Sequence, residues 1–138
     1  MGFFHRLRER IETVDSVVSV GLDPDPDRLP DQLLDHELPR WAFNRRIIDA
    51  THEYAAAYKP NAAFYEDADG WRALEETIAY AHGKDVPVVL DAKRADIGNT
   101  ARQYASVLDE SSGLGADAIT VNPYMGRDSL EPFLSRTE

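Results

Sequence analysis

The hydrophobic residues of this chain follow two spacings, one typical of amphipathic helices and one typical of buried strands. From Phe3 to Val14 apolar residues recur at helical spacing, which predicts a helix that packs under the first strand. Four short apolar runs follow, each succeeded by a helical pattern. The expected strands are residues 16–22, 55–58, 86–92 and 116–121, and the expected helices are 41–54, 69–83, 97–108 and 129–134.

The helical segments also predict which side chains are buried. In the 69–83 segment the core-facing stripe is expected to consist of Trp71, Leu74, Ile78 and Ala81. Asp69 is expected to cap the start of this helix, and Gly83 to end it. In the 41–54 segment the covering side is expected to consist of Trp41, Ile47, Ile48 and Thr51. The first strand is nearly all apolar, as expected when both faces of a sheet are covered.

Strands that alternate with helices indicate a parallel sheet with right-handed crossovers. No expected strand is followed by a glycine-rich phosphate loop, which disfavours a nucleotide-binding doubly wound sheet. The chain has 138 residues, enough for one domain or part of one. A complete (β/α)8 barrel typically needs about 250 residues.

Composition narrows the classes of function. The formal net charge is −10, from 25 acidic and 15 basic residues. Such a surface disfavours nucleic-acid binding and indicates adaptation to high salt. The absence of cysteine excludes disulfides and thiolate metal sites. No apolar run approaches membrane-spanning length, and the start lacks the apolar core of a signal peptide, so we expect no membrane partner and a cytoplasmic protein.

Polar residues mark the carboxyl end of every expected strand. These residues are Asp23, Lys59, Asp91 with Lys93, and Asn122. In (β/α)8 barrels the active site occupies this face of the sheet. Four successive strands that carry such residues therefore predict a site there.

The charges in Asp91-x-Lys93-x-x-Asp96 suggest a lysine held between carboxylates. Neighbouring carboxylates favour the ammonium form, so Lys93 is a candidate general acid, and Lys59 would extend an alternating array. A plain ion-pair cluster that closes the barrel mouth is the alternative. By pattern alone, Asp23 is equally consistent with a turn residue, and Asp96 with a helix cap. Thr100 alone is consistent with a helix-face residue.

The segment 91–101, Asp-Ala-Lys-Arg-Ala-Asp-Ile-Gly-Asn-Thr-Ala, resembles the signature of the orotidine 5′-phosphate decarboxylase family, type 2 branch. The segments 21–24, 58–66 and 120–126 resemble the same branch in the same order. Related sugar-phosphate enzymes share Asp-x-Lys-x-x-Asp but usually place threonine after the lysine, where this chain has Arg94. The resemblance spans essentially the whole chain.

The resemblance implies a (β/α)8 barrel that converts orotidine 5′-phosphate to UMP without metal or organic cofactor, usually as a homodimer. Lys93 resembles the proton donor to C6 of the pyrimidine, and Asp91 the carboxylate placed against the substrate carboxylate. Lys59 resembles the lysine that orders the array and touches the ribose. Asp23 resembles a ribose-hydroxyl ligand, and Asn122 is assigned to substrate binding.

The family match also places two residues near a dimer contact. Asp96 and Thr100 match positions that, in the family, reach into the neighbouring subunit's active site. Only about the first four βα units are expected here, so residues 1–138 correspond to the N-terminal half of a single barrel domain. Two other hypotheses stay open, a cation-dependent hexulose-phosphate synthase or sugar-acid-phosphate decarboxylase, and a non-catalytic half-barrel that self-associates through its open edges.

Overall fold

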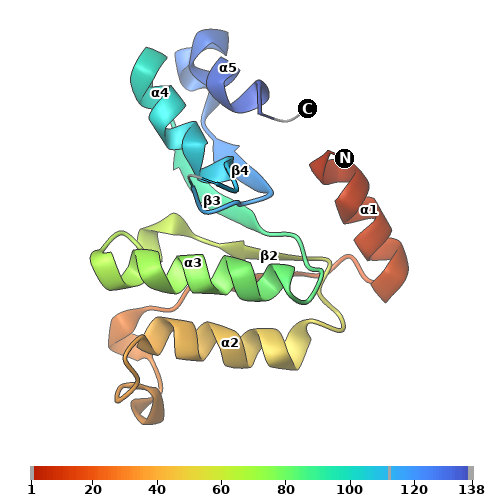
Figure 1. Ribbon diagram of the computed structural model, residues 1–138, viewed down its shortest axis with the longest axis vertical. Coiled ribbons are helices and arrows are strands. Elements are labelled where there is room, and N and C mark those ends of the chain that lie inside the picture. Colours follow the sequence, from red (N-terminus) through yellow and green to blue (C-terminus); the bar gives the residue numbers. More distant parts are fainter. Residues whose placement is uncertain (1, 112, 137–138) are drawn as a thin grey trace.

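The structure, a computed structural model, describes residues 2–111 and 113–136. In these residues the main elements are five α-helices and four strands in the predicted order, with short 3-10 turns between them (Figure 1). The helices are α1 (Phe3–Val14), α2 (Pro39–Thr51), α3 (Ala68–His82), α4 (Gly98–Ala105) and α5 (Arg127–Leu134). The strands are β1 (Ser19–Leu22), β2 (Ala57–Pro60), β3 (Val89–Arg94) and β4 (Ala118–Val121). Helix–strand alternation is therefore confirmed.

The strands form a parallel sheet in the order β1-β2-β3-β4. β1 pairs with β2 from Ser19↔Ala57 to Leu22↔Pro60, and β3 pairs with β4 at Val89↔Ala118. Two isolated parallel bridges, Tyr58↔Val88 and Asn61↔Asp91, connect the two pairs. The carboxyl ends of all four strands consequently lie along one edge, as predicted.

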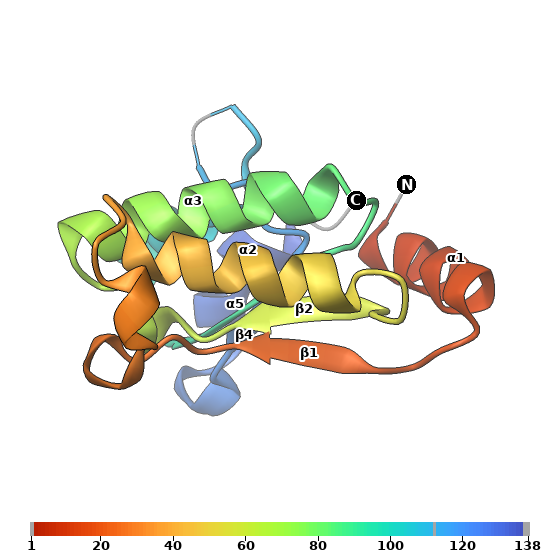
Figure 2. The same cartoon turned by 90° about the horizontal axis from the view of Figure 1, so that it is seen from below.

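The main hydrophobic core lies between the sheet and helices α2 and α3, which cover one side of it (Figure 2). Its large members come from both layers, and they include Leu22, Ile48, Tyr58, Tyr65, Leu74, Ile78, Val88 and Leu90. Each fully buried aliphatic side chain of this size contributes about 1.5–3 kcal/mol relative to an exposed one. A second, smaller cluster of Ala101, Ala105 and Phe133 lies where α4 packs on α5.

The first strand departs from its prediction. β1 begins at Ser19 rather than at residue 16, and the side chains of Val17 and Val18 are 79% and 53% exposed. In the described residues β1 pairs only with β2, so its other edge is open. β1 thus has an apolar sequence typical of a strand with both faces covered, yet it lies at an edge of this sheet.

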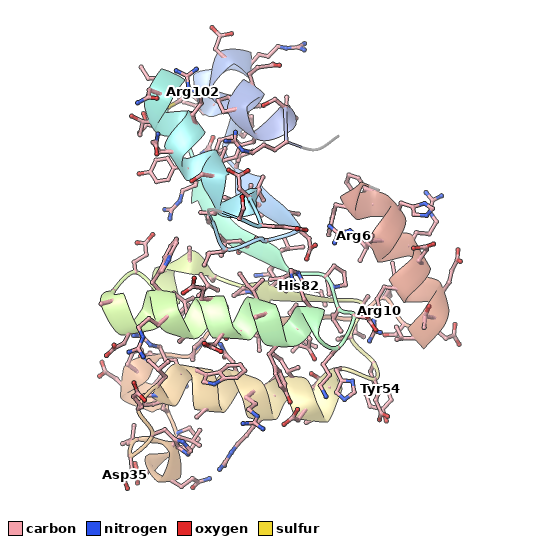
Figure 3. The ribbon with its side chains drawn as sticks, viewed as in Figure 1. Arg6, Arg10, Asp35, Tyr54, His82 and Arg102 are labelled. Carbon is pink, nitrogen blue, oxygen red and sulfur yellow. The ribbon has the colours of Figure 1, made fainter. Side chains whose placement is uncertain are left out.

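The first helix is amphipathic as predicted, but it does not pack under the first strand. None of its described residues is buried. Polar contacts hold it instead, because Arg6 pairs with Asp117 at 2.6 Å and Arg10 donates to the carbonyls of His52 and Ala55. Arg6 and His82, which also contacts Asp117, lie on the same side of the molecule, at the amino ends of the strands (Figure 3).

The third helix is placed as predicted, with differences at its ends. Its cap is Asp67 rather than Asp69, and the Asp67 carboxylate accepts the Gly70 N–H at 2.7 Å. Leu74, Ile78 and Ala81 are buried as expected. Trp71 is 41% exposed because it stands at the border of the buried stripe. Gly83 ends the helix with φ −62°, so its position needs no left-handed backbone.

The predicted covering side of the second helix is half-buried or buried, and Ile47 packs on the main core, but polar residues extend the buried face beyond the predicted set. Its buried residues are Arg40, Asn44 and Ile48, and only Ile48 belongs to the expected set. Arg40 reaches the Asp67 carboxylate at 2.5 and 2.9 Å and the Phe64 carbonyl at 2.9 Å. These partners satisfy the guanidinium, which is how a charged side chain can occupy a buried position.

Among the described residues, no helix has the length and apolar character needed to span a membrane.

Candidate active site

The predicted polar residues lie at the carboxyl-terminal edge of the sheet, where β3 ends two residues later than expected. Asp23 directly follows β1, Lys59 lies within β2, and Asn122 directly follows β4. Because β3 extends to Arg94, Lys93 as well as Asp91 lies inside the strand. Side chains on the opposite face from α2 and α3 are thereby brought together across three strands.

A single carboxylate forms the centre of this site. The Asp91 Oδ1 atom lies 2.8 Å from the Lys93 Nζ atom, and its Oδ2 atom lies 3.1 Å from the Lys59 Nζ atom. The Thr120 hydroxyl donates to Oδ1 at 2.8 Å. The Asp91 side chain is only 14% exposed, whereas those of Lys59 and Lys93 are 40% and 66% exposed.

The surroundings of Asp91 keep it ionised. The hydrogen bond from Lys93, followed by those from Thr120 and Lys59, lowers the pKa of Asp91 to about 2, although partial burial opposes the shift. The site therefore presents a fixed negative charge between two accessible ammonium groups. The Lys59–Asp91–Lys93 part of the expected alternating array is present, and among the described residues Lys93 pairs with one carboxylate rather than two.

The position of Lys93 depends on an unusual backbone conformation. Its φ is +52°, in the left-handed region that a residue with a β-carbon seldom adopts. The pairing register of β3 with β4 shifts between Leu90 and Arg94, and the Lys93 N–H donates to the Thr120 hydroxyl at 3.0 Å. An irregularity of this kind redirects a side chain at the end of a strand. Backbone strain at such a position is typical of functional sites.

Two of the predicted residues stabilise turns at the same edge. The Asp23 Oδ1 atom accepts the Asn61 N–H at 3.1 Å, which ties the end of β1 to the end of β2. The Asn122 Oδ1 atom accepts the Tyr124 N–H at 2.9 Å. The second carboxylate oxygen of Asp23 and the amide of Asn122 lie at the exposed edge, so these turns do not preclude a ligand.

Asp96 and Thr100 do not join the charge cluster. The Asp96 carboxylate accepts the adjacent Ile97 N–H at 2.8 Å, and Asp91 is the only ion-pair partner of Lys93 among the described residues. Thr100 is exposed on α4. Within one chain the expected Lys–Asp–Lys–Asp array therefore consists of Lys59, Asp91 and Lys93, without Asp96.

Thr120 was missed by the sequence reasoning, although a signal for it was available. It is the only polar residue of β4, whose sequence is Ala-Ile-Thr-Val. In the register, Leu90 lies opposite Ile119, so Thr120 shares a face with Asp91. Arg94, one residue beyond Lys93, contacts Glu66 at 3.0 Å and stacks 4.8 Å from the Tyr104 ring. Arg94 thus fixes β3 to neighbouring elements rather than entering the cluster.

Comparisons with known proteins agree with this geometry. Residues 16–138 match the model of the orotidine 5′-phosphate decarboxylase / HUMPS family. The orotidine 5′-phosphate decarboxylase of Haloarcula marismortui is 79% identical over 138 residues, which are 100% of this chain and 50% of that protein. The enzyme of the same name from Halobacterium salinarum is 71% identical over the same length, also 50% of that protein.

Solved structures show the same similarity. The OMP decarboxylase of Leishmania donovani superposes with a TM-score of 0.80 at 48% identity, and the match covers 98% of this chain and 50% of that one. The UMP synthase of Leishmania donovani gives a TM-score of 0.78 at 45% identity, covering 98% of this chain and 28% of that one. The fold is thus α/β, with about four βα units of a (β/α)8 barrel.

The chain spans about half the length of the curated relatives that it matches. The match nevertheless includes every strand, and the family model covers all residues of the charged cluster. Relatives from haloarchaea agree with the salt adaptation expected from the acidic composition. This chain belongs to the orotidine 5′-phosphate decarboxylase / HUMPS family.

Proposed function

We propose that residues 1–138 carry the charged half of the catalytic centre of an orotidine 5′-phosphate decarboxylase, which releases CO2 from orotidine 5′-phosphate to give UMP. The observation that carries this proposal is the Asp91 carboxylate held between the ammonium groups of Lys59 and Lys93 at 3.1 and 2.8 Å. The high identity to decarboxylases from haloarchaea supports the choice of substrate.

Lys93 is the proton donor in this proposal. Loss of CO2 from C6 of the pyrimidine leaves an electron pair in the plane of the ring, where the ring cannot delocalise it. An ammonium group aimed at C6 stabilises the developing charge and then transfers a proton to that carbon. The exposed Lys93 Nζ atom, anchored by Asp91 on one side, has the freedom to meet a bound substrate.

Asp91 acts on the substrate carboxylate. With its pKa near 2, it is ionised at neutral pH and repels a second carboxylate placed beside it. Two unit charges about 4 Å apart repel by about 4 kcal/mol at an effective dielectric of about 20. This repulsion is relieved when CO2 leaves, provided that binding energy from the rest of the nucleotide holds the substrate in place.

The remaining residues serve substrate binding and assembly in this proposal. Lys59 orders the Asp91 carboxylate and approaches the ribose, Asp23 binds a ribose hydroxyl, and Asn122 contributes to substrate binding. Asp96 and Thr100 reach the partner's active site in a homodimer. Asp96 is half-exposed between β3 and α4 and Thr100 is exposed on α4, and both positions are compatible with such a contact.

We place residues 1–138 in a single barrel domain of a cytoplasmic, cofactor-independent enzyme of pyrimidine biosynthesis. The family also includes sugar-phosphate enzymes, and a cation-dependent member would need Asp91 as an available ligand. Here two lysines and a threonine already contact the Asp91 carboxylate, and the positive charges of the lysines disfavour a divalent cation beside it. This arrangement supports the decarboxylase.

A chimera tests the proposal directly. Residues 1–138 would replace the matching half of the Haloarcula marismortui relative, and UMP formation would be followed at high salt with and without EDTA. We expect the chimera to form UMP in both conditions, and the 138-residue chain to form little or none alone. Partial rescue is expected when the relative's second half is supplied separately. Full activity of the lone chain, or a folded chimera that forms no UMP, would refute the proposal.

Sedimentation of the lone chain separates the remaining alternative. A half-barrel with open edges at β1 and β4 is expected to self-associate. If the lone chain forms stable assemblies and the folded chimera forms no UMP, the non-catalytic half-barrel is the correct description. If the chimera is active, self-association of the lone chain reflects only the unpaired edges.

A further inference from the structure

A buried chain of hydrogen bonds connects α2 to the end of β1. The Asn44 Nδ2 atom donates to the Tyr65 hydroxyl at 2.8 Å, and that hydroxyl donates to the Leu22 carbonyl at 2.6 Å. All three residues have an exposed fraction of 0%. The connection therefore runs through the interior, on the face of the sheet opposite the charged cluster.

The Leu22 carbonyl belongs to the peptide group that joins Leu22 to Asp23. A hydrogen bond to this carbonyl fixes the plane of that peptide and with it the direction in which the Asp23 side chain leaves the backbone. Pro60, the register partner of Leu22, has no N–H to offer. The N–H of Asn61, the residue that follows β2, donates to the Asp23 carboxylate itself. Tyr65 thus holds the one peptide whose orientation determines where Asp23 points.

Asn44 takes part in this connection although one of its buried polar atoms stays unpaired, which lowers stability. Its second Nδ2 hydrogen is directed to the Thr77 hydroxyl on α3 at 3.0 Å. Among the described residues its Oδ1 atom has no hydrogen-bond partner, although it is fully buried. Buried amide oxygens are rarely left unpaired. An aliphatic residue would pack here without that penalty, so the amide is better explained by the orientation that it gives to the Tyr65 hydroxyl.

We infer that Tyr65 is a positioning residue, which aims Asp23 at the ribose hydroxyls of the nucleotide and is itself oriented by Asn44. The inference rests on the proposed function, in which Asp23 binds the ribose. Burial raises the pKa of the Tyr65 phenol, so the hydroxyl stays protonated and continues to donate to Leu22 at physiological pH. Neither Tyr65 nor Asn44 contacts the charged cluster in the described structure.

The test is the preference of the active chimera for ribose hydroxyls. Binding of UMP would be compared with binding of 2′,3′-dideoxy-UMP, which lacks both hydroxyls. Tyr65→Phe removes one hydroxyl from the interior, and we expect it to weaken UMP binding about tenfold, the equivalent of one misdirected hydrogen bond, while binding of the dideoxy analogue changes less than twofold. Asn44→Ala is expected to give the same pattern with a smaller loss.

Tyr58→Phe is the matched control. Tyr58 is also fully buried, and its hydroxyl contacts Thr51 and the Ile48 carbonyl on α2, away from the peptide that carries Asp23. We expect it to lower stability without changing the preference for UMP. Equal effects of Tyr65→Phe and Tyr58→Phe on that preference would overturn the inference. If Tyr65→Phe does not fold, Asn44→Ala against Tyr58→Phe decides the same question.

Asp23→Asn separates the inference from the proposed function. This change should abolish the preference for UMP, and adding Tyr65→Phe to it should cause no further loss, because the two residues act through one contact. If Asp23→Asn leaves the preference intact, Asp23 does not bind the ribose and the role proposed for it is wrong. If Asp23→Asn abolishes the preference and Tyr65→Phe does not reduce it, only the positioning role is wrong.

Discussion

The two faces of the sheet differ sharply, although neighbouring residues of the same strands form them. Leu90 and Tyr58 face α2 and α3 and are 2% and 0% exposed. Asp91 and Lys59, the next residues along the chain, face the other way and form the charged cluster. The alternation of side chains along a strand thus assigns stability to one face and chemistry to the other.

This division explains how a strand can hold both kinds of residue. The helix-covered face is apolar and closely packed, so its contribution is burial. On the open face, Asp91 avoids the penalty of a sheltered charge because three donors surround it. Changes on one face should therefore affect unfolding, and changes on the other should affect turnover.

The largest expected effect is the loss of turnover in Lys93→Ala. Removing the proposed proton donor and its charge should lower kcat of the active chimera by at least about 10⁴-fold, since acid catalysis and electrostatic stabilisation are lost together. The free energy of unfolding should change little, because this side chain is 66% exposed. Steady-state assays with chemical denaturation measure both quantities.

Lys84→Ala is the control for that experiment. Lys84 is another of the three lysines of the chain and lies over the Tyr80 ring, 5.4 Å from its centroid, on the helical side. Its removal should leave kcat unchanged. Comparable losses of kcat in both variants would show that net charge, rather than the position of Lys93, controls turnover.

Leu90→Ala should have the opposite effect to Lys93→Ala, because it should lower the free energy of unfolding rather than turnover. Truncation of this buried side chain removes contacts in the main core and leaves a cavity, at a cost of about 2–5 kcal/mol in the free energy of unfolding. Leu34→Ala, at a side chain that is 50% exposed, should cost much less. Urea denaturation at fixed salt compares the two, and equal losses would show that burial in the main core does not account for the cost of Leu90→Ala.

Local patterns in the sequence were sufficient to predict one part of this division. The apolar run before Asp91, the motif with Lys93 and the polar strand ends predicted a parallel sheet with a charged edge, and the structure has both. These features depend on residues close together in the chain. Periodicity and strand ends report such features directly.

Other parts depend on contacts between distant residues, which no local pattern encodes. Nothing around Lys93 indicates a positive φ, because that conformation follows from pairing with β4 and from the contact with Thr120. Buried polar residues on α2 break the helical pattern that predicted its apolar face, and their partners lie 21 to 33 residues away. The exposure of Val17 likewise depends on which strands are present beside β1.

The pH dependence of the free energy of unfolding also tests the charged face, and the expected effect is smaller than those of Lys93→Ala and Leu90→Ala. The folded-state pKa of Asp91 is about 2, below the value of about 3.9 expected when unfolded. A lowered pKa stabilises the fold above the unfolded value, and this contribution is lost as pH falls from about 5 towards 2. We expect it to be about 1 kcal/mol, since the partner lysines are solvent-exposed.

Asp91→Asn should remove that part of the acid dependence. The acid limb, which is the fall in stability as the pH is lowered, should not disappear in the variant. Part of it comes from Asp67, whose pKa is lowered to about 2 by Arg40 on the helical side. Denaturation curves between pH 2 and 7 would show a shallower acid limb in the variant. An unchanged acid limb would mean that Asp91 titrates normally and is not held by the two lysines.

Thr120→Val gives the smallest and most specific effect. It keeps the shape of the side chain but removes the donor to Asp91 and the acceptor for the Lys93 N–H. The pKa of Asp91 should rise towards its ordinary value, with a loss of about 1 kcal/mol in stability. Thr51→Val removes a hydroxyl that bonds to Ile47 and Tyr58 beside the covered face, so it should cost similar stability without altering Asp91. Carboxyl NMR titration of both variants decides whether Thr120 belongs to the chemistry of the open face: a pKa of Asp91 that stays near 2 in Thr120→Val would restrict Thr120 to packing.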